Sequence, residues 1–233
     1  MSTPVTIGLD IGGTKVAGGL VDAAGAVVVR VERPSLVDGR RDPASAVTLA
    51  VARELMARAA ALGLRVDGIG AGFPEYVDPD GRLTSHEVLA WTDQPAGPLG
   101  ALAPATVESD VRCGALAEAT RGAGRGSREV AYVSAGTGLS HAGEATAVAL
   151  LERTGGALGA GLAILARLLD PDVIVLGGGL GAAGGPWRAA LDAAYVARTA
   201  SRPDAPPIVV AALGADAGII GAAIMHRRAA DRG

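Results

Sequence analysis

The segment Asp10-Ile11-Gly12-Gly13-Thr14-Lys15 combines the groups that a phosphate-binding hairpin needs. It offers a carboxylate for Mg²⁺, two glycine amides with no side chain in the way, a hydroxyl and a cation. Because phosphoryl transfer requires mainly positioning and charge neutralisation, this mixture suits that chemistry. An ordinary hairpin turn with a solvated lysine would use the same residues, so the segment alone leaves both interpretations open.

Three more glycine-rich turns follow predicted strands, at residues 70–74, 136–138 and 177–181. Glycine at such turns lets backbone N–H groups approach an anion closely. One turn of this kind is weak evidence. Several of them in an α/β chain indicate a nucleotide held between two lobes.

The predicted elements explain how these turns are positioned. Alternating apolar residues predict a strand from Val5 to Ile11, and two short strands follow it after tight turns, which predicts an antiparallel meander rather than a βαβ unit. Asp42-Pro43 is expected to begin a helix, with Asp42 as its N-cap. A second helix, 146–169, is expected to be interrupted or kinked near Gly155-Gly156. Further strands are expected at 66–73, 106–108, 130–135, 173–176 and 208–212, further helices at 111–121, 187–198 and 216–228, and mostly loop at 74–104.

The composition excludes several classes of protein. The 233 residues are 49% apolar with a net charge of -3, which gives no basic footprint for nucleic acid or an anionic membrane surface. A single cysteine, Cys113, excludes an internal disulfide framework and a cysteine-rich zinc site. No run of eighteen uncharged apolar residues occurs, and the N-terminus lacks the pattern of a signal peptide. We therefore expect a soluble cytoplasmic protein that binds neither nucleic acid nor membrane.

Four segments, in the right order, resemble the ROK family of sugar kinases and repressors, within the actin-like superfamily. The first is the 10–15 hairpin, which is similar to the family's first phosphate motif. The others are similar to its second phosphate loop, its adenosine-side segment and its C-terminal helix: Gly136-Thr137-Gly138, Asp170 to Gly179 (including Gly177 and Gly178), and Leu213 to Ala223. The resemblance covers nearly the whole chain. It implies an α/β, two-lobed actin-like (ribonuclease H-like) fold, with residues 1–109 and a C-terminal helix (214–233) in one lobe and 110–213 in a truncated second lobe.

The resemblance also implies the roles of individual residues. Asp110 takes the place of the catalytic base, which accepts the proton of a sugar hydroxyl as it attacks the γ-phosphate. Asp110 also stands where a helix N-cap is expected, and both roles can coexist. Gly72, Glu75 and Ser109 would contact the sugar, although Ser109 replaces the family's usual Asn and Pro74-Glu75 its Pro-Gly. Glu75 could bind the sugar or be a solvated loop acid.

The largest departure from the family follows Gly138. A long segment with a glutamate and a histidine that contact the sugar, often with a zinc motif, is missing, and Leu139 leads almost at once into a helix. His141 and Glu144 lie nearby, but neither sits in the full motif and both are expected to be exposed. Cys113 and three scattered histidines offer no ligand spacing for zinc.

The resemblance implies an ATP-dependent kinase, with Mg²⁺ held by Asp10 through water, that phosphorylates a hexose or amino-hexose. The shortened lobe predicts low catalytic efficiency or ATP hydrolysis unless a partner subunit covers the site, and a homodimer is left open. One alternative is a non-catalytic relative that binds nucleotide or sugar. DNA binding is not expected, because the chain starts almost directly at its first strand. Another alternative is an NAD-binding oxidoreductase built on Gly179 to Gly184, with Asp204 about twenty residues further on.

Overall fold

The computed structural model describes residues 2–37, 40–41, 46–89, 93–136 and 144–232. The chain forms two compact units, one from residues 1–117 with 215–233 and the other from 118–214. The sequence places this boundary at Asp110. In the structure the first turns of the helix that begins there belong to the first unit, where Cys113 packs against the backbone of Gly72 and Gly221.

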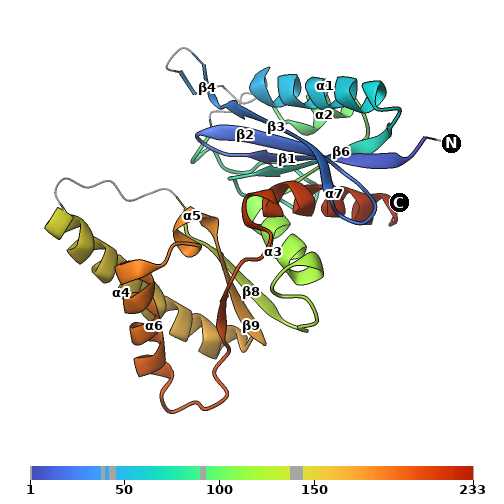
Figure 1. Cartoon of the computed structure of the whole chain (residues 1–233). Coiled ribbons are helices and arrows are strands. Elements are labelled where there is room, and N and C mark those ends of the chain that lie inside the picture. The colour runs from blue at the N-terminus through green and yellow to red at the C-terminus, as the bar shows by residue number, and fades with distance from the viewer. Residues whose placement is uncertain (1, 38–39, 42–45, 90–92, 137–143, 233) are drawn as a thin grey trace. The chain divides into compact units, whose positions relative to one another are not determined.

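A five-stranded sheet forms the centre of the first unit, in the order β3-β2-β1-β6-β7 (Figure 1). Strands β1, β2 and β3 pair antiparallel, as the sequence predicts, whereas β6 and β7 run parallel to β1. This mixture places the carboxyl ends of three parallel strands at one edge of the sheet. The strands are β1 (Pro4–Ile11), β2 (Lys15–Val21), β3 (Val27–Pro34), β6 (Arg65–Phe73) and β7 (Ala105–Ser109), with a separate short pair β4 (Leu36–Val37) and β5 (Arg40–Arg41).

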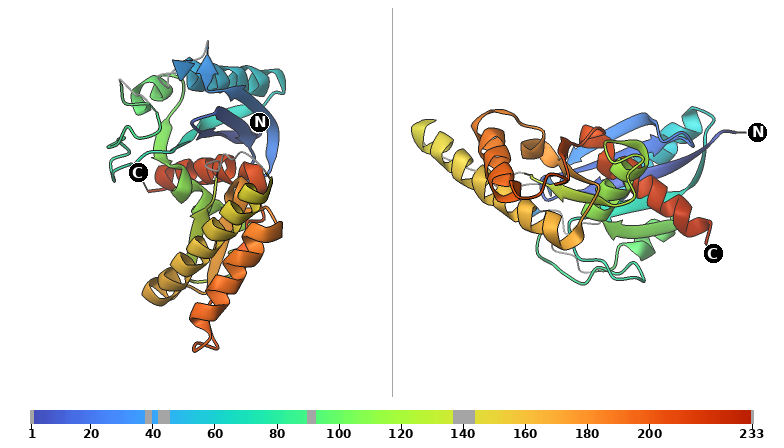
Figure 2. Two further views of the ribbon diagram at one scale, coloured as in Figure 1. Left: turned by 90° about the vertical axis from the view of Figure 1, so that its left-hand side faces the viewer. Right: turned by 90° about the horizontal axis from the view of Figure 1, so that it is seen from below.

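Helices α1 (Ala46–Ala61) and α7 (Ala217–Ala230) cover opposite faces of this sheet (Figure 2). The α1 face is a continuous apolar core, in which Leu9 and Leu55 are fully buried. The α7 face is packed more closely, since a Cβ on Gly70 would lie 1.8 Å from the carbonyl oxygen of Ala222. The C-terminal helix is thus seated directly on the strand backbones.

The second unit has a three-stranded parallel sheet in the order β10-β9-β8. Two long helices, α4 and α6, pack side by side and cover its apolar residues with a core that includes Trp187, Leu191 and Tyr195. The elements are α3 (Asp110–Arg121), which links the units, β8 (Val130–Ser134), α4 (Glu144–Leu169), β9 (Val173–Gly177), α5 (Gly178–Gly181), α6 (Gly185–Thr199) and β10 (Ile208–Val210).

Helix α4 runs without a break from Glu144 to Leu169, so the expected interruption near Gly155-Gly156 is wrong. Glycine serves another purpose here, because a Cβ on Gly155 would lie 2.2 Å from the carbonyl oxygen of Trp187 and one on Gly159 2.1 Å from that of Leu191. The two glycines therefore let α6 approach the α4 backbone closely. A pattern of helix-breaking residues does not distinguish such a packing surface from a kink.

Part of α4, from Val148 to Leu169, is long and apolar enough to cross a membrane, with a mean hydropathy of 1.4. Only 22% of this stretch is buried. A single helix with these properties is weak evidence for a membrane span, because helices of soluble proteins pass the same test of length and composition.

One other expectation needs adjustment, and one is not tested. The segment 74–104, expected to be mostly loop, contains the short helix α2 (Ala96–Gly100) and a bridge between Val77 and Leu83. The proposed N-cap, Asp42, lies outside the described residues.

Candidate active site

The parallel strands β1, β6 and β7 bring two acidic segments to one edge of the sheet of the first unit. Asp10 pairs in register with Gly72, and Gly72 pairs with Glu108. The hairpin after β1 and the Ser109-Asp110 segment after β7 therefore leave the sheet at the same edge. In open α/β sheets, ligands bind at the carboxyl ends of the strands.

The carboxylate of Asp10 lies partly buried against the first turn of α7. A Cβ built on Gly218 would lie 2.6 Å from Asp10 Oδ2, so only glycine leaves room for this carboxylate. Burial and the negative charge of Asp110 raise the pKa of Asp10 from 3.8 to about 6, against the opposing effects of Lys15 and Arg30. A carboxylate in such a setting is stabilised by a bound cation, and carboxylate oxygen with water is the ligand set that Mg²⁺ prefers.

The hairpin itself is closed by a hydrogen bond from the Gly12 N–H to the Lys15 carbonyl oxygen, at 2.9 Å. The Gly12 amide is thereby engaged within the turn, and the Gly13 and Thr14 amides are the remaining candidates to contact a phosphate. Lys15 is half exposed, and its Nζ lies 3.1 Å from Glu32 Oε2. The lysine is therefore an ion-paired residue at the rim of the hairpin.

Asp110 is the first residue of α3 and lines a cavity of about 300 Å³. Its Oδ1 accepts a hydrogen bond from the Val111 N–H at 2.7 Å. Burial raises the pKa of Asp110, and the negative charge of Glu75 adds to this increase, while backbone hydrogen bonds oppose it. Asp110 thus contacts the helix start and also faces the cavity. The other lining residues are Pro74, Glu75, Tyr76, Ser85, Glu87, Ser109 and Val111.

The three predicted sugar contacts have different settings. Ser109 lines the cavity, and its N–H donates to Glu108 Oε1 at 2.8 Å. Gly72 is buried next to the helix, since a Cβ there would lie 3.3 Å from both Cys113 Sγ and Asp110 Cα. Glu75 is only 6% exposed, so its interpretation as a solvated loop acid is wrong.

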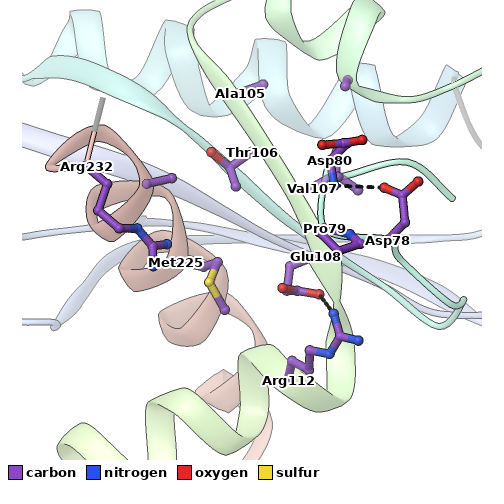
Figure 3. Close-up of a pocket in the computed structure, with 13 residues that line it drawn as sticks. Asp78, Pro79, Asp80, Ala105, Thr106, Val107, Glu108, Arg112, Met225 and Arg232 are labelled. Carbon is purple, nitrogen blue, oxygen red and sulfur yellow. Dashed lines mark hydrogen bonds and ion pairs between the residues drawn. The ribbon is translucent and has the colours of Figure 1, made fainter.

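A larger cavity of about 520 Å³ lies along β7 and the end of α7 (Figure 3). Arg112 donates to Glu108 Oε1 at 2.8 Å in its wall, and the Thr106 hydroxyl is 3.0 Å from His226 Nδ1. Among the described residues that line it, none was predicted from the sequence as a site residue. We therefore place the candidate chemistry in the smaller cavity, where Asp110 lies.

In the second unit, the structure brings the two remaining glycine motifs together. The Ala135 N–H donates to the Gly177 carbonyl oxygen at 2.9 Å, and the Ala135 carbonyl oxygen accepts from the Leu180 N–H at 3.0 Å. Gly178 has a φ of +82°, and a Cβ there would lie 2.3 Å from the Ala135 oxygen. The turn therefore requires glycine. Gly136 and Gly179 are exposed beside it, whereas Thr137 and Gly138 lie outside the described residues.

Sequence reasoning missed one buried acid, Glu118. It is fully buried, and its carboxylate accepts hydrogen bonds from the N–H groups of Ala123, Ala212 and Leu213 at 2.7–3.0 Å. These contacts join the end of α3 to the segment after β10. Glu118 occupies an ordinary helical position, and two of its three partners, Ala212 and Leu213, are more than 90 residues away, so no local pattern could have identified it.

The structure does not support a dinucleotide site at Gly179 to Gly184. Asp204 precedes β10, at the amino edge of the parallel sheet, whereas Gly177 and Gly178 follow β9 at its carboxyl edge. An acid for a ribose would have to follow a strand at the carboxyl edge. Within the described ranges, no group of three or more His, Cys, Asp or Glu residues is placed to hold a metal ion. His141 and the side chain of Glu144 are not described.

The fold is a mixed α/β fold that is shared with solved structures of ROK kinases, of the actin-like class. The structure is similar to a crystal structure of a ROK family glucokinase from Streptomyces griseus in complex with glucose and AMPPNP, with a TM-score of 0.80 and 22% identity over 96% of this chain and 99% of that chain. The ROK family model matches residues 6–142 and 139–229. The chain therefore belongs to the ROK family.

Two curated relatives are similar over about 60% of the chain. A glucokinase from Halalkalibacterium halodurans is 28% identical over 146 residues, which are 60% of this chain and 43% of that protein. A glucokinase from Streptomyces coelicolor is 30% identical over 142 residues, 58% of this chain and 42% of that protein. The chain thus matches less than half the length of these relatives.

Proposed function

We propose that the chain is an ATP-dependent kinase that phosphorylates a hydroxyl group of a hexose or amino-hexose, with Asp110 as the general base. The observation that carries this proposal is the position of Asp110 in a cavity at the sheet edge where the Asp10 hairpin also emerges. Membership of the ROK family and the similarity to glucokinases support the same reaction class.

The residues present fit a magnesium nucleotide. Asp10 would hold Mg²⁺ through water, and its raised pKa marks a carboxylate that a cation would stabilise. Gly13, Thr14 and Lys15 would contact phosphate in the hairpin that the Gly12 N–H closes. Gly136, Thr137 and Gly138 would contact phosphate as well. Gly177, Gly178 and Gly179 would flank the adenosine. ATP would supply the γ-phosphoryl group, with Mg²⁺ neutralising its charge.

Within the cavity, Asp110 would accept the proton of the sugar hydroxyl as that oxygen becomes the nucleophile. Its raised pKa makes the Asp110 carboxylate a stronger base than an ordinary Asp. Ser109 and Glu87 would orient the sugar from the cavity wall. Glu75 shapes that wall, because both of its carboxylate oxygens accept hydrogen bonds from the protein.

A second candidate function is that of a non-catalytic family member that binds sugar or nucleotide. The observation that favours this second function is that the chain matches less than half of its curated relatives. In either case we place the protein in the cytoplasm with a small sugar as its partner, and a homodimer would supply further cover for the site.

A phosphate-transfer screen over hexoses and amino-hexoses tests the proposal. The full chain is incubated with ATP and Mg²⁺, and ADP release is measured with and without each sugar. A kinase gives sugar-dependent ADP release and a phosphorylated sugar, with some sugar-independent release if the site is open to water. Stabilisation against heat by ATP and Mg²⁺ but not by NAD would accompany it. Heat stabilisation by sugar or nucleotide without any transfer would favour the non-catalytic protein.

Gly218→Ala is expected to lower transfer about 10- to 100-fold, because the new Cβ would displace the Asp10 carboxylate. The stability of helix α7 itself should not decrease, since alanine is a better helix former than glycine. The matched control is Gly156→Ala in α4, where a Cβ meets nothing within 4 Å and activity should be retained. Equal activity of both variants in the same ADP-release assay would show that transfer does not depend on the location of the Asp10 carboxylate beside Gly218.

A further inference from the structure

The buried carboxylate of Glu75 accepts four hydrogen bonds, all from the short segment 85–89. One oxygen accepts from the N–H groups of Val88 and Leu89 at 2.9 and 2.8 Å, and the other from the Glu87 N–H at 3.0 Å and from the Ser85 hydroxyl. These hydrogen bonds lower the pKa of Glu75 against the opposing effect of burial. The carboxylate is thus held ionised and gathers the segment 85–89 around itself.

The segment 85–89 contacts both parts of the proposed site, the acceptor cavity and the phosphate hairpin. Ser85 and Glu87 line the cavity that contains Asp110. Val88 lies against the phosphate hairpin, since a Cβ on Gly13 would be 3.1 Å from Val88 Cγ1. Leu89 is 2% exposed and anchors the end of the segment in the apolar core.

We propose that Glu75 is a positioning residue that sets the distance between the acceptor cavity and the phosphate hairpin through the segment 85–89. The inference rests on the proposed kinase function for its catalytic consequence. Its structural basis does not depend on that function, because the contacts are present whether or not the chain transfers phosphate. All of these contacts lie in the first unit. Four donors converge on two oxygens, and only a carboxylate can accept from all of them.

Glu75 is 6% exposed, so its carboxylate is a buried charged anchor for the segment 85–89. Such an anchor is worth more than a neutral hydrogen bond, because charge-assisted hydrogen bonds are about twice as strong.

The test is Glu75→Gln in the full chain, which keeps the size of the side chain but presents an NH₂ group to backbone N–H donors. The matched control is Glu118→Gln, the same change in another buried glutamate that accepts three backbone N–H groups. Both variants are expected to unfold at lower temperature. Only Glu75→Gln should raise the sugar KM, with kcat/KM lower by about 10- to 100-fold, and increase ADP release without sugar.

Hydrogen exchange provides a readout that does not need activity. In Glu75→Gln the amides of residues 87–89 and of the hairpin at 12–15 should exchange faster than in the wild type, whereas Glu118→Gln should leave both segments unchanged. Faster exchange at 87–89 alone, with an unchanged hairpin and sugar KM, would overturn the positioning role. If the wild type transfers phosphate to no sugar, the kinase proposal fails, and the exchange data still decide whether Glu75 links the two segments.

Discussion

Asp110→Asn is expected to reduce sugar-dependent ADP release by about 10²- to 10⁴-fold, the usual contribution of a general base. The amide keeps the shape of the side chain and an oxygen that can accept from the Val111 N–H, so the start of α3 should be retained. What is lost is the ability to take a proton from the acceptor hydroxyl. Since burial raises the pKa of Asp110, the variant should unfold at a temperature no lower than the wild type near neutral pH.

The pH dependence of kcat/KM for the sugar provides a second measurement. Wild-type activity should fall as the pH drops through the pKa of Asp110, which lies above the ordinary Asp value. The residual activity of Asp110→Asn should lack this acidic limb. Asp172→Asn is a suitable control, because it alters a carboxylate that accepts two backbone N–H groups in the second unit. If Asp110→Asn turned over as fast as this control, Asp110 would have no role in the transfer step.

Asp10→Asn is expected to abolish most transfer and, at the same time, to stabilise the protein without nucleotide. The folded pKa of Asp10 is about 6, above its ordinary value of 3.8, so the folded state binds the proton more tightly than the unfolded state. Stability from this group is therefore complete below about pH 4 and is lost as the pH rises to about 6. An amide avoids the loss, which is worth up to about 3 kcal/mol.

Thermal unfolding from pH 4 to pH 8 would test this expectation. The unfolding temperature of Asp10→Asn should exceed that of the wild type above pH 6, and the difference should shrink toward pH 4. Adding Mg²⁺ and ATP should stabilise the wild type more than the variant, because only the carboxylate gains from a cation. A difference that stays constant with pH would mean that Asp10 carries no unfavourable charge in the folded state.

Local patterns were sufficient for much of the first unit. The alternation from Val5 to Ile11 and the tight turns after it predict the meander that the structure confirms. The same is true of the strand that ends at Phe73 and of the helix that follows Ser109. These features depend on residues close in sequence, where hydrophobic period and turn chemistry act directly.

Glycines were harder to interpret from sequence, because a glycine in a helix has several explanations. Gly155-Gly156 suggests a break in the helix, whereas Gly155 and Gly159 instead allow α6 to pack closely. Gly218 looks like an ordinary residue of the last helix, yet its missing Cβ makes room for the Asp10 carboxylate. Which explanation holds depends on what lies opposite, and that neighbour is more than 25 residues away in each case.

The sequence by itself determined the family and most of the order of the elements, and it predicted the phosphate hairpin and the acid expected to serve as the base. Only the tertiary structure decided that Glu75 and Glu118 are buried anchors. It also decided that the negative charge of Asp110 helps to raise the pKa of Asp10. The physical reason is the separation along the sequence between the groups that determine each feature. Hairpins and helix starts are fixed by neighbours along the chain, whereas the burial and pKa of a carboxylate depend on donors and charges that the fold brings from elsewhere.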